Sequence, residues 1–328
     1  MSRIYEALQK AESERKLERR EPEPRVPENP VSAAMGAAAA AAVAENEERA
    51  AEPIFTEPTF AEPRFAERYR EPSAPRASGD SLDLSKVVMR PWSPSLAQLP
   101  ALLERGPAVE QFRSLRSRIF ELRDISPLKT ILVSSGLPQE GKSFVSTNLA
   151  LSLARHKNSK VLLIDGDMRR YTLHQILGCE SHPGLADYLA GKASAVEVMQ
   201  RPEPLQVTAA GPTPILPNLT FIAGGNGGDK AADLSGSPRF GELVRLAAPY
   251  FDWIIVDSSP VLPVSDAVNL ARSCDGVLLV ARGGVTKFPV AQRAQAELKA
   301  SNILGFVLNA VHDTPEVGSY YGYNASNQ

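Results

Sequence analysis

The sequence contains few of the features that mark secreted, membrane-spanning or nucleic-acid-binding proteins. Only two cysteines occur in 328 residues, Cys179 and Cys274, and their spacing suggests neither a metal site nor a redox pair. We expect both to be buried, unbridged thiols in a reducing compartment. No apolar run reaches the length of about 18 residues that a membrane-spanning helix needs. The formal net charge is −2, so no global field would attract nucleic acid or anionic lipid.

The first third of the chain has little that could form a core. Residues 1–20 are a candidate amphipathic helix whose narrow apolar stripe suits a partner better than a core of its own. Residues 21–106 are rich in proline, glutamate and alanine, and a five-residue repeat over residues 52–66 carries one phenylalanine per copy. Regular proline prevents a helix, and so few apolar groups cannot offset chain entropy. We expect a disordered tether that acts as a spacer, with order beginning near Pro107. The alternative is that its phenylalanines are docking points for a partner.

A phosphate-binding motif lies between a predicted strand and a predicted helix. The apolar run Thr130–Val133 predicts a buried strand, and apolar residues at every fourth position after Ser143 predict a helix. Between them the chain reads G-x-x-x-x-G-K-S. In this setting the loop backbone surrounds phosphates, Lys142 reaches the β- and γ-phosphates, and the Ser143 hydroxyl ligates Mg²⁺. The predicted nucleotide-binding residues are Gly136, Leu137, Pro138, Gln139, Glu140, Gly141, Lys142, Ser143 and Phe144.

Two later predicted strands end in carboxylates. Lys160–Asp165 is an apolar run that continues into Asp167, so the two acids can face one crevice at a strand's carboxyl end. Phe251–Asp257 also ends in an acid, which is where nucleoside triphosphatases hold Mg²⁺. The candidate catalytic residues are therefore Lys142, Asp165, Asp167 and Asp257, and the candidate metal ligands are Ser143, Asp165 and Asp257. Which of Asp165 and Asp167 would act as a base stays open.

Strands and helical segments alternate after residue 107, which predicts an α/β fold over residues 107–312. The sheet should be parallel with helices on both faces, in three layers. Further predicted helices are Ala108–Arg123, Thr172–Leu177, Leu185–Ala190, Ser194–Gln200, Ser237–Ala247, Val264–Ala271 and Lys287–Ala300. Further predicted strands are Leu219–Ala223, Gly276–Val280 and Gly305–Asn309, and Arg201–Pro217, with five prolines, should be a surface loop.

Charged residues mark one face of the predicted helix Ala108–Arg123. Glu110, Arg113 and Arg116 lie away from its apolar stripe and should point outward. Most such faces are simply solvated. The alternative is a self-complementary contact in which Glu110 of one copy meets arginines of the next, a head-to-tail pairing that makes rings.

The last residues, 313–328, are predicted to be a flexible tail. Tyr320, Tyr321 and Tyr323 lie there among glycine and polar residues, with no apolar residues to pack against. Disorder or a binding patch is one interpretation, and phosphorylation of these hydroxyls is the other.

Taken in order, the nucleotide motifs resemble those of the bacterial tyrosine kinases of polysaccharide export, which are P-loop proteins. The resemblance covers about Val109–Tyr323. Ser135–Ser143 is similar to the family's Walker A motif, Val161–Arg169 to its second acidic motif, and Ile254–Pro260 to its Walker B motif. Gln139 stands where the family usually has glycine.

Two motifs outside the nucleotide site extend the resemblance. Glu110-x-x-Arg113-x-x-Arg116 matches the family's oligomerisation motif, and the terminal tyrosines resemble its autophosphorylation tail. The resemblance implies an ATP- and Mg²⁺-dependent protein-tyrosine autokinase that phosphorylates its tail in trans within a ring. It also implies that Arg169 and Asn309 contact the nucleotide, Asn309 at adenine.

The opening residues are similar to cytosolic members found beside exosortase-linked exopolysaccharide loci. That branch implies a separate, membrane-spanning chain-length-determinant protein as activator and a cognate tyrosine phosphatase. The balanced charge predicts no nucleic-acid partner. We therefore expect a cytoplasmic protein that lies at the inner face of the cell membrane through its partner.

Two other functions stay open. Plasmid-partition and septum-positioning ATPases share this fold and act as nucleotide-switched dimers, but their phosphate loop carries an extra lysine that Gly136–Pro138 lacks. A non-catalytic ATP-binding scaffold is the other alternative. The terminal tyrosines and the Asp165–Asp167 pair argue against it.

Overall fold

The computed structural model describes residues 82–157, 159–203, 216 and 218–311. The predicted N-terminal helix, most of the predicted tether and the tyrosine-containing tail lie outside these residues. No helix in the described part combines the length and the apolar character that crossing a bilayer requires.

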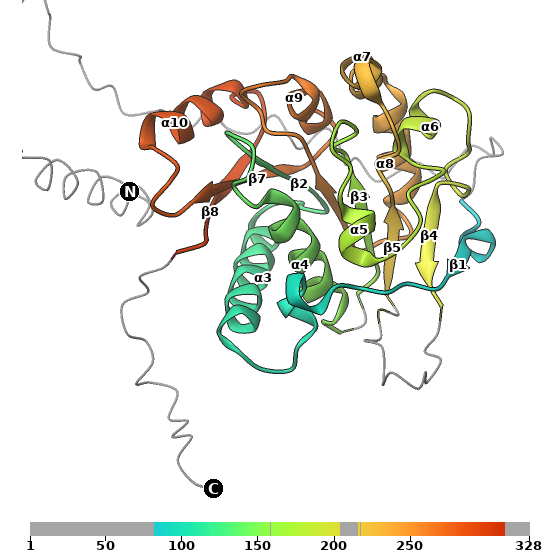
Figure 1. Cartoon of the computed structure of the whole chain (residues 1–328), viewed down its shortest axis with the longest axis horizontal. Helices are drawn as coiled ribbons and strands as arrows, with labels where there is room; N and C mark the ends of the chain where they lie inside the picture. The colour runs from blue at the N-terminus through green and yellow to red at the C-terminus, as the bar shows by residue number, and fades with distance from the viewer. Residues whose placement is uncertain (1–81, 158, 204–215, 217, 312–328) are drawn as a thin grey trace, which may run out of the picture. The chain divides into compact units, whose positions relative to one another are not determined.

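An eight-stranded sheet organises the described part of the chain (Figure 1). The strand order is β1-β4-β5-β3-β6-β2-β7-β8, and all neighbouring pairs are parallel except β4 with β5. The strands are β1 Val88–Arg90, β2 Thr130–Ser135, β3 Val161–Asp165, β4 Met199–Pro202, β5 Leu219–Ile222, β6 Trp253–Asp257, β7 Gly276–Arg282 and β8 Ile303–Asn309. The predicted α/β sheet is confirmed, with one antiparallel pair added.

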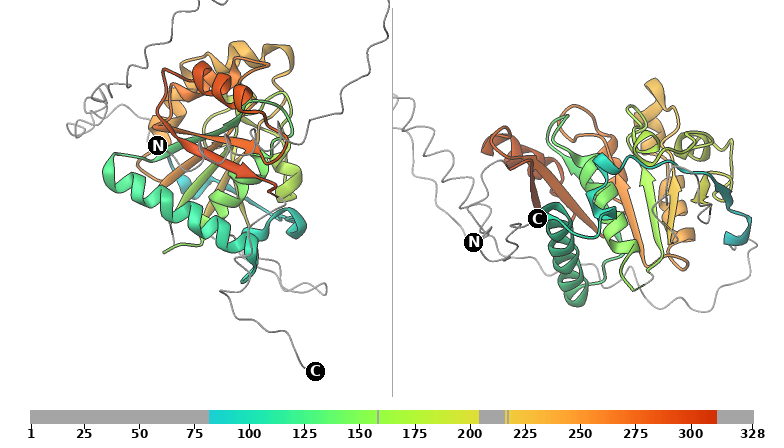
Figure 2. Two further views of the ribbon diagram at one scale, coloured as in Figure 1. Left: turned by 90° about the vertical axis from the view of Figure 1, so that its left-hand side faces the viewer. Right: turned by 60° about the horizontal axis from the view of Figure 1, so that its bottom comes forward.

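Helices cover both faces of this sheet, as predicted. The α-helices are α3 Pro107–Ile125, α4 Lys142–Ala154, α5 Leu173–Leu177, α6 Leu185–Leu189, α7 Ala231–Ser235, α8 Arg239–Ala247, α9 Asp266–Ala271 and α10 Phe288–Glu297. Four short 3₁₀ helices are η1 Leu84–Lys86, η2 Leu96–Gln98, η3 Pro100–Leu102 and η4 Gly228–Lys230. The left view of Figure 2 places α3, in green, and α10, in red, on opposite sides of the sheet.

Two apolar clusters fill the spaces between the layers. Successive residues of a strand point to opposite faces, so Ile254 and Val256 of β6 join one cluster while Trp253 and Ile255 join the other. The first cluster packs under α6, α8, α9 and α10, and the second under α3, α4 and α5. Central strands buried on both faces explain the continuous apolar runs that the sequence shows at β2, β3 and β6.

Order begins before Pro107, so the predicted tether is wrong for residues 82–106. Trp92 and Leu99 are buried in the cluster under α4, and β1 pairs with β4 at the edge of the sheet. Asn148 of α4 accepts a hydrogen bond from the Ala101 N–H at 3.0 Å and donates one to the Gln98 carbonyl. Figure 1 shows this segment in cyan, running between β1 and α4. Its apolar residues follow no regular period, so only their contacts with distant elements reveal it.

A truncation in this segment tests whether it belongs to the folded domain. We expect Leu99→Ala to lower the free energy of unfolding by about 2–5 kcal/mol, because the removed side chain is fully buried. Leu96→Ala, three residues earlier and 48% exposed, is the control and should change it by less than about 0.5 kcal/mol. Denaturant unfolding measures both, and equal small effects would show that residues 82–106 are a linker.

The predicted helix Ser194–Gln200 is also wrong. A turn precedes β4, whose Gln200 pairs with Val88 of β1 and with Phe221 of β5. Because β4 spans Met199–Pro202, the predicted loop loses its first two residues to a strand, and residues 204–215 lie outside the description. A short segment of this kind has no reliable period, so pairing with strands on both sides decides its structure.

The remaining predicted elements are confirmed, with ends that differ by a few residues, while η4 and α7 were not predicted. Both cysteines are unbridged, but only Cys274 is buried, since Cys179 is half-buried. Burial nevertheless raises the pKa of the Cys179 thiol to about 12, so it stays protonated at neutral pH.

Candidate functional site

The phosphate loop connects β2 to α4 with two residues in the left-handed region. Gly141, which precedes α4, has φ = 95°, and a β-carbon there would lie 1.9 Å from the Asn309 side-chain nitrogen. Gln139 has φ = 65°. Left-handed backbone favours glycine, which explains why the resembling family usually has glycine at this position. The loop therefore has the strand–loop–helix geometry that surrounds an anion with N–H groups.

Glu140 holds this loop in place from inside. Its buried carboxylate accepts hydrogen bonds from the Leu137 N–H at 2.8 Å and from the Thr286 hydroxyl. The Asn309 amide donates to the Glu140 carbonyl at 3.0 Å. The loop is thus fastened to the turn after β7 and to the end of β8. Thr286 was not among the predicted residues. Its role follows from the burial of Glu140, whose carboxylate needs hydrogen-bond donors, and the sequence does not show that burial.

Three acids gather at the carboxyl ends of β3 and β6, next to the loop. Asp165 and Asp257 are paired residues of these two adjacent parallel strands. The Ser143 hydroxyl donates to Asp257 Oδ2 at 2.6 Å, and Lys142 Nζ lies 3.2 Å from Asp167 Oδ2. The structure therefore brings together all four predicted catalytic residues and the predicted metal ligand Ser143.

Burial sets the electrostatics of this cluster. It raises the pKa of the Asp257 carboxyl to about 6, against the opposing effects of the Lys142 charge and the Ser143 hydrogen bond. Burial also holds the pKa of Asp165 well above its ordinary value, and the neighbouring charges of Asp257 and Asp167 add to this. Two buried carboxylates side by side leave the cluster in need of a cation.

Among the buried carboxylates of the described residues, Asp257 has an unsatisfied oxygen that suits a metal. Its Oδ1 is buried and accepts no hydrogen bond from the described residues, while Oδ2 takes the Ser143 hydroxyl. Within the described ranges no group of three or more His, Cys, Asp or Glu side chains forms a metal site on its own. Mg²⁺ usually binds through one or two carboxylates plus substrate phosphates, so Ser143 and Asp257 fit a magnesium ion that arrives with a nucleotide.

Asp165 and Asp167 differ in their contacts. Both oxygens of Asp165 accept backbone N–H groups, from Asp167 at 3.2 Å and from Leu173 at 3.1 Å. Asp165 therefore orders the turn that presents Asp167, in addition to lying beside Asp257. Asp167 faces Lys142, and its side chain is 4% exposed.

Arg169 and Asn309, the two residues implied by resemblance alone, lie in different surroundings. Arg169 Nε donates to Asp266 Oδ2 at 2.7 Å, which anchors the turn after β3 to the start of α9. Asp266 was not predicted, and its signal was a buried acid in an otherwise apolar helix. Asn309 touches the phosphate loop through Glu140 and Gly141.

The charged face of α3 lies apart from this cluster and differs from its prediction. Arg113 is exposed and forms an ion pair with Glu110 on the same helix. Arg116 does not point freely outward, because it is half-buried and donates to the Ser152 carbonyl of α4 at 2.9 Å. The last-turn carbonyls of a helix lack partners within the helix, which explains this contact. The predicted phosphoacceptors Tyr320, Tyr321 and Tyr323 lie outside the described residues.

Removing the Thr286 hydroxyl tests the role of Glu140. We expect Thr286→Val to lower the free energy of unfolding by about 1–3 kcal/mol, because a buried carboxylate oxygen loses its donor. Thr286→Ser, which keeps the hydroxyl, should restore most of the loss. Chemical denaturation gives both values, and an unchanged stability in Thr286→Val would show that Glu140 does not depend on this bond.

Comparisons with known proteins point in one direction, although no protein-family model matches the chain. It is 34% identical over 223 residues to the putative tyrosine-protein kinase EpsB of Ralstonia solanacearum, which is 67% of this chain and 27% of that protein. It is 33% identical over 218 residues to the tyrosine-protein kinase YwqD of Bacillus subtilis, covering 65% of this chain and 85% of YwqD. The chain thus spans about a quarter of the length of EpsB and most of YwqD.

A solved structure agrees with these relatives. The kinase domain of the Escherichia coli tyrosine kinase ETK superposes with a TM-score of 0.54 at 30% identity. The match covers 66% of this chain and 80% of that domain.

Proposed function

The chain belongs to the family of bacterial tyrosine-protein kinases, and from that premise we propose that it is an ATP-dependent protein-tyrosine autokinase. The observation that carries the proposal is the pairing of Ser143 with Asp257, whose second carboxylate oxygen is buried and unsatisfied beside the phosphate loop. This arrangement suits a nucleotide that brings Mg²⁺ with it.

Each residue of the cluster has a separate task in this mechanism. The loop from Gly136 to Phe144 would hold the phosphates, and Ser143 with Asp257 would hold the metal. Bound Mg²⁺ would supply neutralisation of charge on the β- and γ-phosphates. Lys142 would exchange Asp167 for the γ-phosphate, since the two anions compete for one ammonium group.

Asp167 is better placed than Asp165 to receive the tyrosine proton. Both oxygens of Asp165 accept backbone N–H groups, whereas Asp167 accepts one only on Oδ1, from Arg170, so its Oδ2 would be released when Lys142 turns to the phosphate. A carboxylate is a modest base for a phenol. The loose transition state of phosphoryl transfer requires only late removal of the proton, so a well-placed carboxylate suffices.

We further propose that the substrates include Tyr320, Tyr321 and Tyr323 of a neighbouring copy. From Ala310 to Tyr323 the chain can reach about 45 Å at roughly 3.3 Å per residue. Asn309, just before this stretch, contacts the phosphate loop, so the chain leaves the sheet beside the site. The same contact supports a nucleotide-binding role for Asn309 near adenine, whereas the proposed nucleotide contact of Arg169 rests on the family resemblance.

A ring of copies would bring such tails to neighbouring sites. Arg113 is exposed and its ion pair with Glu110 could open to the Glu110 of another copy, while Arg116 stiffens the same helix against α4. The family resemblance further suggests a membrane-spanning chain-length-determinant protein as activator, a cognate tyrosine phosphatase, control of exopolysaccharide export, and a cytoplasmic position at the membrane. Phosphate adds about −1.5 to −2 charges per tyrosine, which would repel the acidic site and loosen the ring.

The test is to incubate the full chain with ATP and Mg²⁺, alone and fused to the cytoplasmic segment of its membrane partner. Mass mapping then locates phosphotyrosine, with Lys142→Ala as the control. We expect phosphate on Tyr320, Tyr321 or Tyr323 that is absent from the control. Hydrolysis of ATP with unmodified tyrosines under both conditions would instead indicate a nucleotide-switched ATPase.

A further inference from the structure

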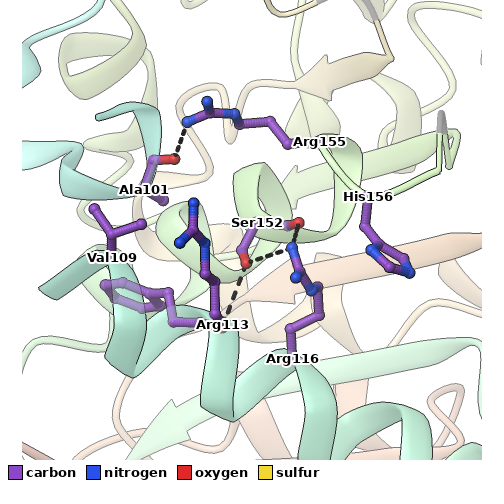
Figure 3. Close-up of a pocket in the computed structure, with 8 residues that line it drawn as sticks. Ala101, Val109, Arg113, Arg116, Ser152, Arg155 and His156 are labelled. Carbon is purple, nitrogen blue, oxygen red and sulfur yellow. Dashed lines mark hydrogen bonds between the residues drawn. The ribbon is translucent and has the colours of Figure 1, made fainter. Parts of the chain in front are cut away.

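A second polar pocket lies away from the phosphate loop, where α3, α4 and η3 meet. Its volume is about 230 Å³, and Figure 3 shows the guanidinium groups of Arg113, Arg116 and Arg155 arranged around it. The apolar part of its lining comes from Val109 and Phe112 of α3. The pocket is at the carboxyl end of α4, whereas the phosphate loop is at the amino end of the same helix. The two sites are therefore separate.

The arginines of this pocket are not matched by acids. Arg113 pairs with Glu110, but Arg116 and Arg155 have no carboxylate within ion-pair distance among the described residues. Their partners there are carbonyls: Arg116 Nη1 donates to Ser152, and Arg155 Nη1 donates to Ala101 at 2.7 Å. Three guanidinium groups thus share one carboxylate, which leaves an excess of two positive charges.

The other residues that line the pocket supply no negative charge to balance this excess. Burial lowers the pKa of the Arg116 guanidinium, and repulsion from Arg113 and Arg155 lowers it further, against the smaller opposing effect of the Glu110 charge. Burial likewise lowers the pKa of His156, with additional repulsion from Arg116 and Lys157. Each guanidinium carries five N–H donors, while the hydrogen bonds of Arg116 and Arg155 to described residues use Nη1 alone. The other donors suit an incoming anion.

We propose that this pocket binds an aryl phosphate, that is, a phosphate monoester of a small aromatic group. A dianion matches the excess of two charges, and arginine pairs with phosphate through two parallel hydrogen bonds. The Phe112 ring and Val109 form an apolar wall that the aromatic group of the ligand can contact. Pockets for drug-sized ligands measure about 300–1,000 Å³, so this smaller one suits a single group. A phosphotyrosine side chain and a free aryl phosphate share this chemistry, and the proposal does not depend on kinase activity. Because Arg113 also belongs to the proposed ring contact, such a ligand would compete with that contact.

Calorimetric titration with phenyl phosphate tests the proposal. The full chain carries Lys142→Ala so that the phosphate loop does not dominate the signal, and it is used at a concentration where it is monomeric. We expect saturable binding of one equivalent at low salt, and a dissociation constant about tenfold or more higher when Arg155→Gln is added. Arg118→Gln is the matched control, because Arg118 is an exposed arginine of α3 paired with Glu121. It should leave the dissociation constant unchanged.

A second variant separates binding from folding. Arg155 also holds the carbonyls of Ala101 and Leu103, so its replacement could loosen η3. Arg113→Gln removes an exposed guanidinium and should weaken binding by a similar factor with an unchanged melting temperature. The proposal fails if phenyl phosphate does not bind or if both variants bind it normally. It also fails if Arg118→Gln weakens binding as much as the two pocket variants do.

Further ligands identify the chemistry and its source. If benzoate binds as tightly as phenyl phosphate, the pocket recognises a carboxylate as well as it does a phosphate, and the proposed phosphate specificity is wrong. If inorganic phosphate binds as tightly, the aromatic group contributes nothing to binding, and that part of the proposal is wrong. A short phosphotyrosine peptide that binds tighter than phenyl phosphate would identify a protein segment as the source. Equal affinity of the two would support a free aryl phosphate.

Discussion

The Lys142→Ala variant should phosphorylate tyrosine about 10²–10³-fold more slowly than the natural chain. Removal of a preorganised group that stabilises developing charge typically has an effect of this size. Lys142 Nζ is 3.2 Å from Asp167, with a side chain that is 14% exposed, so it is already positioned beside the phosphate loop. Quantitative phosphotyrosine mass spectrometry at saturating ATP gives the rate.

A lysine at the amino ends of the strands, away from the site, provides the control for this variant. Lys160 is exposed and precedes β3, whereas the site lies at the carboxyl ends of the strands. Lys160→Ala removes the same charge and should keep the natural rate. A comparable loss in both variants would mean that net charge, and not the position of Lys142, controls the reaction.

Asp257→Asn should greatly slow Mg²⁺-dependent phosphorylation while making the metal-free protein more stable. The change keeps the shape of the side chain and an acceptor for Ser143, but it removes the charge that would hold the metal. We expect a decrease in rate of about 10²–10³-fold, as for other losses of electrostatic stabilisation.

The gain in stability follows from the sign of the pKa shift. Burial raises the pKa of Asp257 to about 6, so the ionised carboxylate is disfavoured in the folded state. Its favourable contribution is present at low pH and is lost as the pH rises through 6. With EDTA at pH 8, Asp257→Asn should therefore raise the free energy of unfolding by about 1–3 kcal/mol.

Two outcomes of the Asp257→Asn experiment would contradict this interpretation. Full Mg²⁺-dependent activity would remove Asp257 from the metal site. A loss of stability at pH 8 would show that the carboxylate is paired more favourably than its unsatisfied oxygen suggests. Urea unfolding between pH 4 and 7 also gives the dependence of stability on pH, which should be weaker in the variant.

The nucleotide site could be predicted in detail because its parts are local or lie at equivalent strand ends. The loop from Gly136 to Ser143 follows a strand and opens a helix, so its geometry is contained in about 25 consecutive residues. Asp165 and Asp257 end two apolar runs, and the carboxyl ends of parallel strands meet at one edge of the sheet. Nothing comparable connects Glu140 to Thr286, which are 146 positions apart.

The sequence by itself determined the three-layer α/β fold and the phosphate loop, because strand and helix periods and a contiguous motif record them. Only the tertiary structure decided where order begins, since Trp92 and Leu99 are held by α4 and the sheet, and no local period marks them. It also decided that Arg116 caps α4 instead of facing solvent, and that three arginines enclose a pocket. Such contacts join residues far apart in the chain, and their energy depends on burial and on charges that no single segment contains.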